Sequence, residues 1–306
     1  MTFVKILCKP SRYLYTTKYY AMKNYFSVLI FVLCITAFSA CTTAKYVYTP
    51  ATANLLLLEK KNDIKAAVNY VQAGTILGLN NGSRESHGAD IQGAYAINDK
   101  IGVKVSAYTK KEYNEADFSY ANDPKDMVNY KKNGIEISGG LYDFSGKKAK
   151  NRFHLFGGAG TGRFSFSENR FNGITRDLYH HNMSYLKLFL QPALILNATG
   201  RYTVTLSTVP SLVKYYNVRT NYTDLSDEPL GYIETKPSIF VDFVLQNEFS
   251  FNGLRGFSFQ WQAGLTDLLT RFPTSPSSGF SNEKYDYNKG WLAVGIIANF
   301  NTLLSK

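Results

Sequence analysis

The chain has 306 residues, of which 15% are aromatic, and it contains 23 Tyr, 21 Phe and 23 Gly but only 9 Pro. This composition favours twisted, aromatic-rich strands and excludes a disordered chain. The net charge is +11, and five of the basic residues precede Cys41. The remaining positive charge is spread thinly along the chain, so we expect no nucleic-acid partner.

The N-terminal part has the form of a lipoprotein leader. Residues 1–21 have no clear role and are interpreted as an upstream extension. Residues 22–40 begin with "MK" and continue into an apolar stretch that ends in "FSA", as a signal peptide does. Two small residues, Ser39 and Ala40, directly precede Cys41, which predicts cleavage before Cys41 and attachment of a lipid to its thiol. Phe38 replaces the usual leucine of such signals, which leaves a plain secretory signal open.

The residues after the leader exclude a disulfide. The three cysteines are Cys8, Cys34 and Cys41, so the mature chain has no second thiol, and we expect no zinc site and no cofactor. Residues 41–62 are expected to form a tether. The apolar run at 55–58 is too short to cross a membrane and is expected to pack under the domain that follows.

From residue 63 to residue 302 the hydrophobic pattern has period two. In "ADIQGAYAI" and "IGVKVSAYT", Ile91 and Val105 alternate with polar neighbours, as in strands that have one apolar face. We expect ten strands, beginning near Asp63, Ala89, Ile101, Gly134, Arg152, Ser184, Arg201, Ser238, Gly256 and Gly290. The predicted fold is all-β: a single antiparallel up-and-down β-barrel over 63–302.

Three features favour a barrel that spans the outer membrane. Tight turns at 98–100, 197–200 and 252–255 alternate with long loops, at 110–133, 167–183, 214–236 and 270–289. The polar face is rich in Gly, Ser, Gln and Thr, which suits a hydrated lumen. Aromatic residues gather near strand ends: Tyr108, Tyr113, Phe118, Tyr202, Phe249, Phe251, Phe257 and Trp291.

An even strand number puts both ends of the barrel on the periplasmic side. A lipid on Cys41 would then enter the inner leaflet of the outer membrane. The expected partners are outer-membrane lipid and the machineries that sort lipoproteins and assemble barrels.

Two stretches resemble a known group of proteins. "LLEKKNDIKAAVNY" (57–70) and "DIQGAYAINDKIGVKVSAY" (90–108) resemble lipid-anchored outer-membrane β-barrel proteins of Gram-negative bacteria. The similarity covers roughly 22–108 and implies a barrel in the outer membrane, with no catalytic residues. Such barrels often end on an aromatic residue, whereas this chain ends at Lys306 with Phe300 as the nearest candidate.

Few residues suggest catalysis or metal binding. His180 and His181, with Asp177 and Ser184, could form a lipid-remodelling site, or a metal site with His154. Adjacent histidines on a polar loop diverge, so we favour a surface loop without a metal. The glycine-rich "FGGAGTGRF" lacks the Gly-Lys-Ser/Thr of a phosphate loop and is expected on a strand.

The inner face of the predicted barrel carries charges of both signs: Lys104, Glu136, Lys187, Asp242 and Glu248. These can pair across a narrow lumen or line a selective pore. The leading hypothesis is a non-catalytic outer-membrane barrel lipoprotein with a structural, adhesive or narrow-transport role. The alternatives are a lipid-remodelling barrel enzyme and a membrane-tethered soluble barrel that binds a small apolar ligand.

Overall fold

The computed structural model describes residues 46–73, 84–116, 126–142, 151–171, 176–199, 201–221, 233–234, 236–251, 253–270, 286–287 and 290–304. The chain divides into two compact units, Met1–Cys41 and Thr42–Lys306, and every described residue belongs to the second. The predicted extension, the signal peptide and the lipid-attachment residue Cys41 lie outside the described residues.

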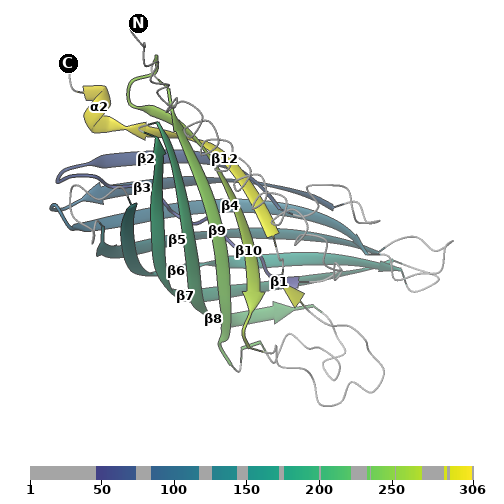
Figure 1. Cartoon of the computed structure of the whole chain (residues 1–306). Helices are drawn as coiled ribbons and strands as arrows, with labels where there is room; N and C mark the ends of the chain where they lie inside the picture. The colour runs from purple at the N-terminus through teal and green to yellow at the C-terminus, as the bar shows by residue number, and fades with distance from the viewer. Residues whose placement is uncertain are drawn as a thin grey trace, which may run out of the picture. The chain divides into compact units, whose positions relative to one another are not determined.

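Within the described residues, ten strands close into one antiparallel barrel (Figure 1). They are β2 (Ile64–Ala73), β3 (Arg84–Ala96), β4 (Ile101–Ala116), β5 (Asp126–Leu141), β6 (Asn151–Phe171), β7 (Arg176–Thr199), β8 (Tyr202–Thr220), β9 (Ser238–Ser250), β10 (Phe257–Leu268) and β12 (Gly290–Asn299). β12 pairs with both β10 and β2, which closes the sheet. The predicted all-β barrel of ten strands is confirmed.

Three further elements accompany the barrel in the part of the chain that the structure describes. The short strands β1 (Tyr46–Tyr48) and β11 (Asp286–Tyr287) pair in parallel, and helix α2 (Phe300–Leu304) follows β12. No helix among the described residues has the length and the apolar character needed to cross a bilayer.

Short and long connections alternate around the barrel, as predicted. Residues 97–100 join β3 to β4 and residues 200–201 join β7 to β8, whereas 221–237 separate β8 from β9 and 269–289 separate β10 from β12. We call the two ends of the barrel the turn end and the loop end. β2 begins and β12 ends at the turn end, beside the last residues of β3.

Six strands, β3 to β8, extend farther toward the loop end than predicted. β4, β6 and β8 run to Ala116, Phe171 and Thr220, inside the predicted loops. β3, β5 and β7 begin five to eight residues before the predicted starts at Ala89, Gly134 and Ser184. The predicted loops at 110–133 and 167–183 are therefore largely strand. Most outward-facing residues in these extensions are polar, with Met127 and Leu178 as exceptions, so the alternation of apolar and polar residues on which the prediction depended is interrupted there.

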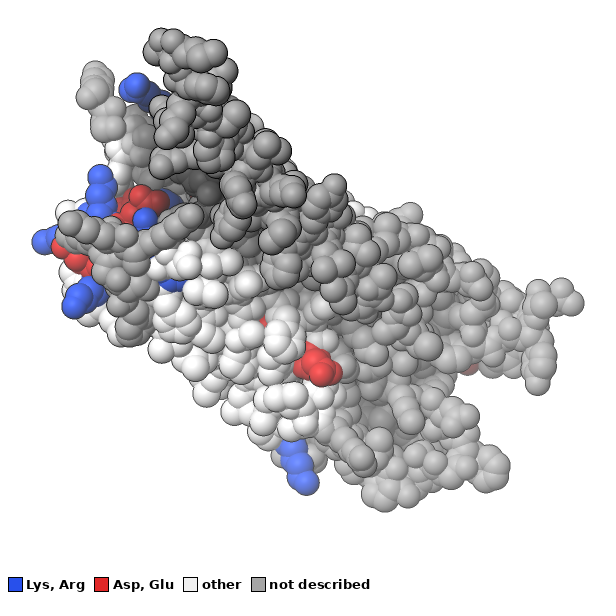
Figure 2. Space-filling view, in the orientation of Figure 1, with Lys and Arg blue, Asp and Glu red and all other residues white. Residues whose placement is uncertain are grey.

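The outward face of the wall is apolar along the middle of the barrel. Ile91, Val105 and Ile137, from three neighbouring strands, are 61%, 54% and 63% exposed. The face shown in Figure 2 carries few charged side chains between the ends of the described wall. Further exposed members are Val68, Ile101, Ile135, Leu186, Leu188, Leu190, Leu194, Leu206, Phe243 and Ile296. An apolar band of this extent on a closed barrel faces hydrocarbon, so a soluble barrel with an apolar core does not fit.

The predicted aromatic girdle is present in part. Three expected members face outward at the turn end and are exposed: Phe249, Phe251 and Phe257. Tyr202 packs against Phe249, with ring centroids 4.7 Å apart. Tyr108 and Trp291 are instead buried in the lumen, because their places in the period-two pattern turn them inward. Phe118 lies outside the described residues.

The two ends of the barrel domain meet at the turn end. Asn301 Nδ2 in α2 donates to the Asn62 carbonyl over 2.8 Å, and Asn301 Oδ1 accepts from the Ile64 N–H over 3.0 Å. Phe300, the nearest terminal aromatic residue, begins α2 instead of ending β12 and is exposed. These hydrogen bonds join the last element to the start of the first barrel strand.

Candidate functional site

The lumen is occupied by the chain's own N-terminal part. We call residues 46–58 the lumen segment; its side chains from Tyr48 onward are largely buried among inward-facing side chains of the wall. Most of the described part of the predicted tether therefore lies inside the barrel, and residues 55–58 pack against the lumen wall and not beneath a domain. A ten-stranded barrel encloses more space than its own side chains must fill, which leaves room for this segment.

Thr49 anchors the lumen segment near the loop end. Its hydroxyl donates to Glu112 Oε1 over 3.0 Å and accepts from Lys110 Nζ over 2.6 Å. Lys110 and Glu112 also form an ion pair of 2.5 Å, and Lys132 Nζ donates to the Thr49 carbonyl. Two buried cations and a carboxylate thus converge on one residue, and each would be costly to leave without a partner.

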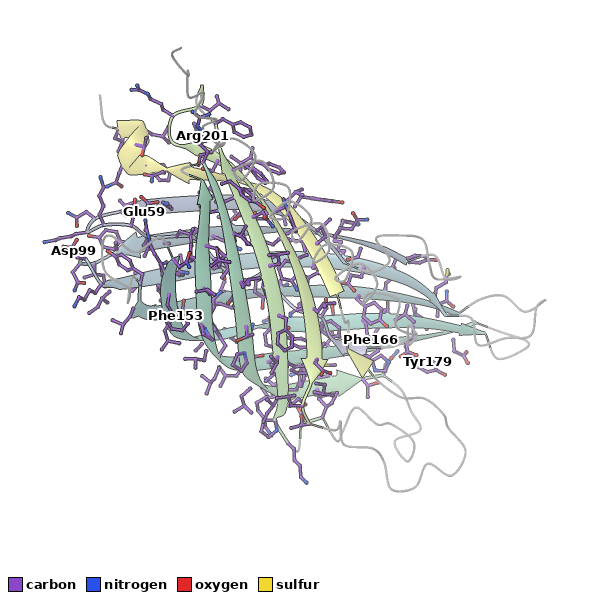
Figure 3. All side chains as sticks on the ribbon, viewed as in Figure 1. Glu59, Asp99, Phe153, Phe166, Tyr179 and Arg201 are labelled. Carbon is purple, nitrogen blue, oxygen red and sulfur yellow. The ribbon has the colours of Figure 1, made fainter. Side chains whose placement is uncertain are left out.

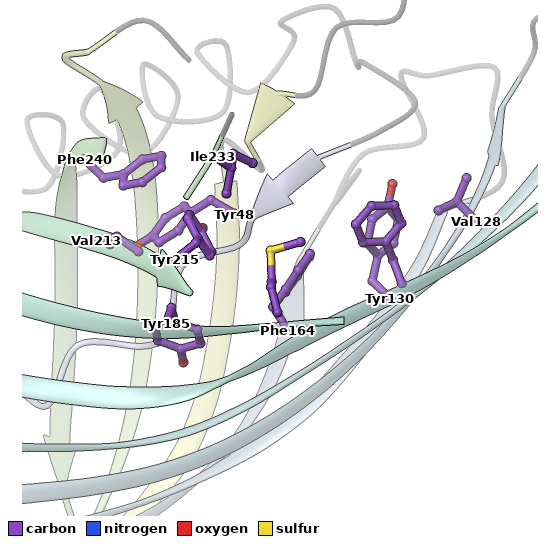
Figure 4. Close-up of a cluster of buried hydrophobic side chains, with 11 residues drawn as sticks. Tyr48, Val128, Tyr130, Phe164, Tyr185, Val213, Tyr215, Ile233 and Phe240 are labelled. Atoms are coloured by element: carbon purple, nitrogen blue, oxygen red, sulfur yellow. The ribbon is translucent and has the colours of Figure 1, made fainter. Parts of the chain in front are cut away.

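An apolar cluster closes the lumen around Tyr48 at the loop end (Figure 4). The Tyr48 ring stacks on Phe240 with centroids 3.8 Å apart and an interplanar angle of 11°. Lys132 Nζ lies 4.9 Å from the centroid of the same ring. The other members of the cluster are Val128, Tyr130, Phe164, Phe166, Met183, Tyr185, Val213, Tyr215 and Ile233.

Halfway along the lumen the segment is held through its backbone. Lys104 Nζ donates to the Asn54 carbonyl over 3.0 Å, and Gln92 Nε2 donates to the Ala53 carbonyl over 3.3 Å. Leu55 packs against the opposite wall, which is formed by Val71, Ala193, Val209, Val244, Trp291 and Ala293. A cavity of ≈ 20 Å³ remains beside this part of the segment, which is room for about one water molecule.

Near the turn end the segment is packed by apolar contacts. Leu56 and Leu58 are fully buried and cluster with wall residues that include Tyr142 and Phe156. A Cβ atom at Gly102 would overlap the Leu58 side chain, so glycine is required for this close approach. The segment then leaves the lumen, where the Asn62 N–H donates to the Ala96 carbonyl over 2.9 Å.

The fit of Leu58 against Gly102 can be tested by substitution. Gly102→Ala is expected to lower the free energy of unfolding in detergent micelles by about 1–3 kcal/mol, because the added methyl group overpacks the lumen. In a Leu58→Ala background the same change is expected to cost less, because the clashing atoms are gone. Gly253→Ala is the matched control, since a Cβ there meets no atom within 4 Å. Equal costs in both backgrounds would contradict the contact.

The contacts along β4 give the direction of the segment. Thr49 meets Glu112 and Lys110, Asn54 meets Lys104, and Leu58 meets Gly102. The segment therefore runs from the loop end to the turn end, the two ends marked in Figure 3 by Tyr179 and Asp99. The pairing of β1 with β11, in the connection between β10 and β12, also places Tyr46 at the loop end.

The predicted lipid on Cys41 lies outside the described residues. The barrel begins and ends at the turn end. The described segment instead enters the lumen from the opposite end. The periplasmic position of the lipid stays a prediction, because strand parity fixes only the ends of the barrel and carries no information about the path of the residues before it.

The charged residues predicted for the inner face do point inward. Lys187 Nζ pairs with Glu136 Oε1 at 2.9 Å, and Asp242 accepts a hydrogen bond of 2.6 Å from the Thr266 hydroxyl. Lys104 and Glu248 share this face. With the lumen segment in place, Lys187 pairs with Glu136, Lys104 donates to the Asn54 carbonyl, and a cavity of only ≈ 20 Å³ remains beside them.

The histidine pair lies on a strand and not on a loop. Both residues belong to β7, where His181 faces the lumen and His180 faces outward. The His181 ring stacks on Phe166 with centroids 4.4 Å apart, and His181 Nε2 lies 3.7 Å from Glu168 Oε1. Ser184 has the opposite parity and faces outward, so the structure does not bring it together with His181.

The other chemical candidates are also dispersed. His154 is buried among Tyr142 and Phe156, close to the turn end, whereas His181 lies toward the loop end. The described residues contain no group of three or more His, Cys, Asp or Glu that could hold a metal ion. The glycine-rich run at 156–164 lies in β6, as predicted, and a Cβ at Gly162 would lie 2.5 Å from the Tyr185 hydroxyl.

Comparison with known proteins gives similarity of structure alone. No protein-family model and no curated protein matches the chain. The translocator domain of autotransporter NalP from Neisseria meningitidis is similar at 14% identity and a TM-score of 0.46, over 79% of this chain and 89% of that one. The outer membrane protease OmpT from Escherichia coli has 9% identity and a TM-score of 0.36, over 81% and 98%. An outer membrane channel from Pseudomonas putida F1 has 8% identity and a TM-score of 0.40, over 82% and 100%.

The class of the protein follows from its own geometry. A closed antiparallel barrel satisfies all backbone polar groups of its wall without an exposed edge, and its outward face is apolar. The protein is an outer-membrane β-barrel. Its interior is a filled lumen in which wall and segment share their polar contacts.

Proposed function

We propose that the protein is a non-catalytic barrel lipoprotein that holds its N-terminal segment in the lumen and presents the preceding residues, with the long connections, at the loop end. The observation that supports this most strongly is the buried path of the lumen segment, fixed at Thr49 and Asn54. A filled lumen favours a structural or adhesive role over transport. The enzyme alternative has no support from His181 and Ser184, which face opposite sides of the wall.

In this proposal Cys41 carries a lipid at the outer mouth of the barrel. The chain between residues 41 and 46 reaches at most about 18 Å, which is less than the roughly 30 Å of a hydrocarbon core. An acyl chain attached there enters the outer leaflet. The partners are then outer-membrane lipid, the barrel-assembly machinery and the lipoprotein-sorting machinery.

The orientation can be tested with an epitope inserted in the full chain. After Ala44, the epitope is expected to bind antibody on intact cells, because the lumen segment enters from the loop end. The same epitope between Asp99 and Lys100 is the control and is expected to bind only in permeabilised cells, because this turn lies at the turn end. Fatty-acid labelling of wild type but not of Cys41→Ala tests the lipid.

The reverse labelling pattern, with the 98–100 turn accessible on intact cells and the N-terminal epitope protected, would contradict the proposed orientation. Heat-modifiable migration of each variant on gels confirms that the barrel has formed. If wild type does not incorporate the fatty-acid label, Cys41 carries no lipid. The position of the lumen segment inside the barrel would not be affected by that result.

A further inference from the structure

A row of polar side chains crosses five neighbouring strands on the outer wall near the loop end. His87, Lys111, Lys131, Ser165 and Asn182 are successive register partners from β3 to β7. Each has the outward parity of its strand, and all but Ser165, which is half-buried, are exposed. All of these residues except Ser165 lie in parts of the strands that the hydrophobic pattern did not predict.

The row lies just beyond the apolar band. On β5, Lys131 is followed along the same face by Asn133 and then by Ile135, where the band begins. Four residues of strand span about 13 Å, which a tilt of about 40° reduces to roughly 10 Å of height. The row therefore lies near the outer edge of the headgroup layer, which is about 5–7 Å thick in each leaflet.

A cavity in the wall coincides with this row. It has a volume of ≈ 380 Å³, and its lining includes Lys111, Lys131, Ser167, His180 and Asn182. Ammonium, hydroxyl and amide groups all donate hydrogen bonds, so the lining suits an anion with several acceptor oxygens.

The charges of the cavity are not balanced by the described protein. Lys111 and Lys131 lie directly opposite each other on adjacent strands, an arrangement that destabilises a sheet unless a counter-charge is present. Among the described residues neither lysine has an acidic partner. Glu112, which also lines the cavity, pairs with Lys110 on the lumen side. Arg163 adds a further outward cation on the neighbouring strand β6.

We propose that this cavity binds the phosphate of a lipid headgroup in the adjacent leaflet, with Lys111 and Lys131 on the phosphate oxygens. The source is a lipid and not a free ion, because the cavity opens on the outer wall next to the apolar band. Acyl chains of the same molecule can lie along Ile135 and Leu186, which are exposed below it. The phosphate removes the repulsion between the two lysines.

The test uses the full-length protein in detergent micelles with dioleoyl phosphatidate as the probe. Native mass spectrometry is expected to show retained phosphatidate on wild type, and at least about tenfold weaker retention on Lys111→Gln/Lys131→Gln, which lacks both charge-assisted contacts. Lys60→Gln/Lys61→Gln, which removes two exposed lysines at the turn end, is the matched control and is expected to retain lipid as wild type does. Retention is also expected to fall between ~0.05 and ~0.5 M salt.

Two results would overturn the proposal. Equal retention by the double variant and its control would show that the lysines do not hold the phosphate. Displacement of phosphatidate by inorganic phosphate at equal concentration would show that the site is a soluble-anion site without lipid preference. Dioleoyl phosphatidylcholine, whose phosphate carries a neutralising choline, is expected to be retained less than phosphatidate. Heat-modifiable migration verifies that each variant is folded.

Discussion

Deletion of residues 46–57 from the full chain is expected to turn a closed barrel into a conducting one. In the native structure Tyr48, Thr49 and Leu55 fill the lumen, and the remaining cavity beside residues 51–54 is only ≈ 20 Å³. Without the segment, the inward groups Lys104 and Lys132 lose their carbonyl partners and are free to hydrate. In planar-bilayer recordings, wild type is expected to show no steady current steps. The deletion variant is expected to show current steps at least about tenfold above background.

A length-matched deletion of residues 271–282, in the connection between β10 and β12, is the control for this experiment. It leaves the lumen segment in place, so the barrel is expected to remain closed. Lys104→Cys adds a second measurement: a membrane-impermeant thiol reagent is expected to label it only when residues 46–57 are absent. Two results would contradict the closure of the lumen by the lumen segment. One is wild-type protein that conducts as the deletion variant does, and the other is a folded deletion variant that shows no conductance and no labelling of the cysteine.

The barrel could be predicted because the membrane imposes a simple rule on its wall. Every lipid-facing residue must be apolar and every second residue must face the lumen, so Ile91, Val105 and Ile137 mark their strands without any knowledge of the fold. The inward position of Lys187 and Glu136 followed from the same parity. Pairing between opposite charges on the inner face was expected in general, without naming partners, and these two residues form such a pair at 2.9 Å.

The strand extensions could not be predicted by that rule, since it applies only where the wall meets hydrocarbon. Lys111, Lys131 and His180 face water or headgroups, so alternation at their strands gives way to a polar stretch that looks like a loop. Hydrogen bonds between neighbouring strands continue regardless of side-chain polarity. The histidine pair was assigned to a loop for the same reason.

The lumen segment was missed because it has no regular period. Its burial depends on irregular contacts, in which Thr49 meets Lys110, Asn54 offers its carbonyl to Lys104, and Leu58 fits against Gly102. One signal was available: the apolar run at 55–58 stands between the proposed anchor and the first strand. A free tether has no reason to bear four leucines, whereas a barrel with a polar wall and a wide interior needs apolar filling.

Removal of Lys187 is expected to destabilise the barrel more than any surface charge change. Lys187→Met leaves Glu136 without its 2.9 Å partner and beside Asp242, in a lumen with little room for water. Removal of one member of a buried ion pair costs about 3–5 kcal/mol, because the remaining charge is no longer compensated. The free energy of unfolding, measured with guanidinium chloride in detergent micelles, is expected to fall by about that amount.

A double variant separates the lost pair from lost packing. Lys187→Met/Glu136→Gln removes both charges, so it is expected to recover more than half of the loss caused by Lys187→Met alone. The control is Lys60→Gln, which removes an exposed charge at the turn end and is expected to cost less than about 1 kcal/mol. If the double variant is as unstable as the single one, the side chain of Lys187 stabilises the lumen through its methylene groups, and the charge of Glu136 is solvated independently of it.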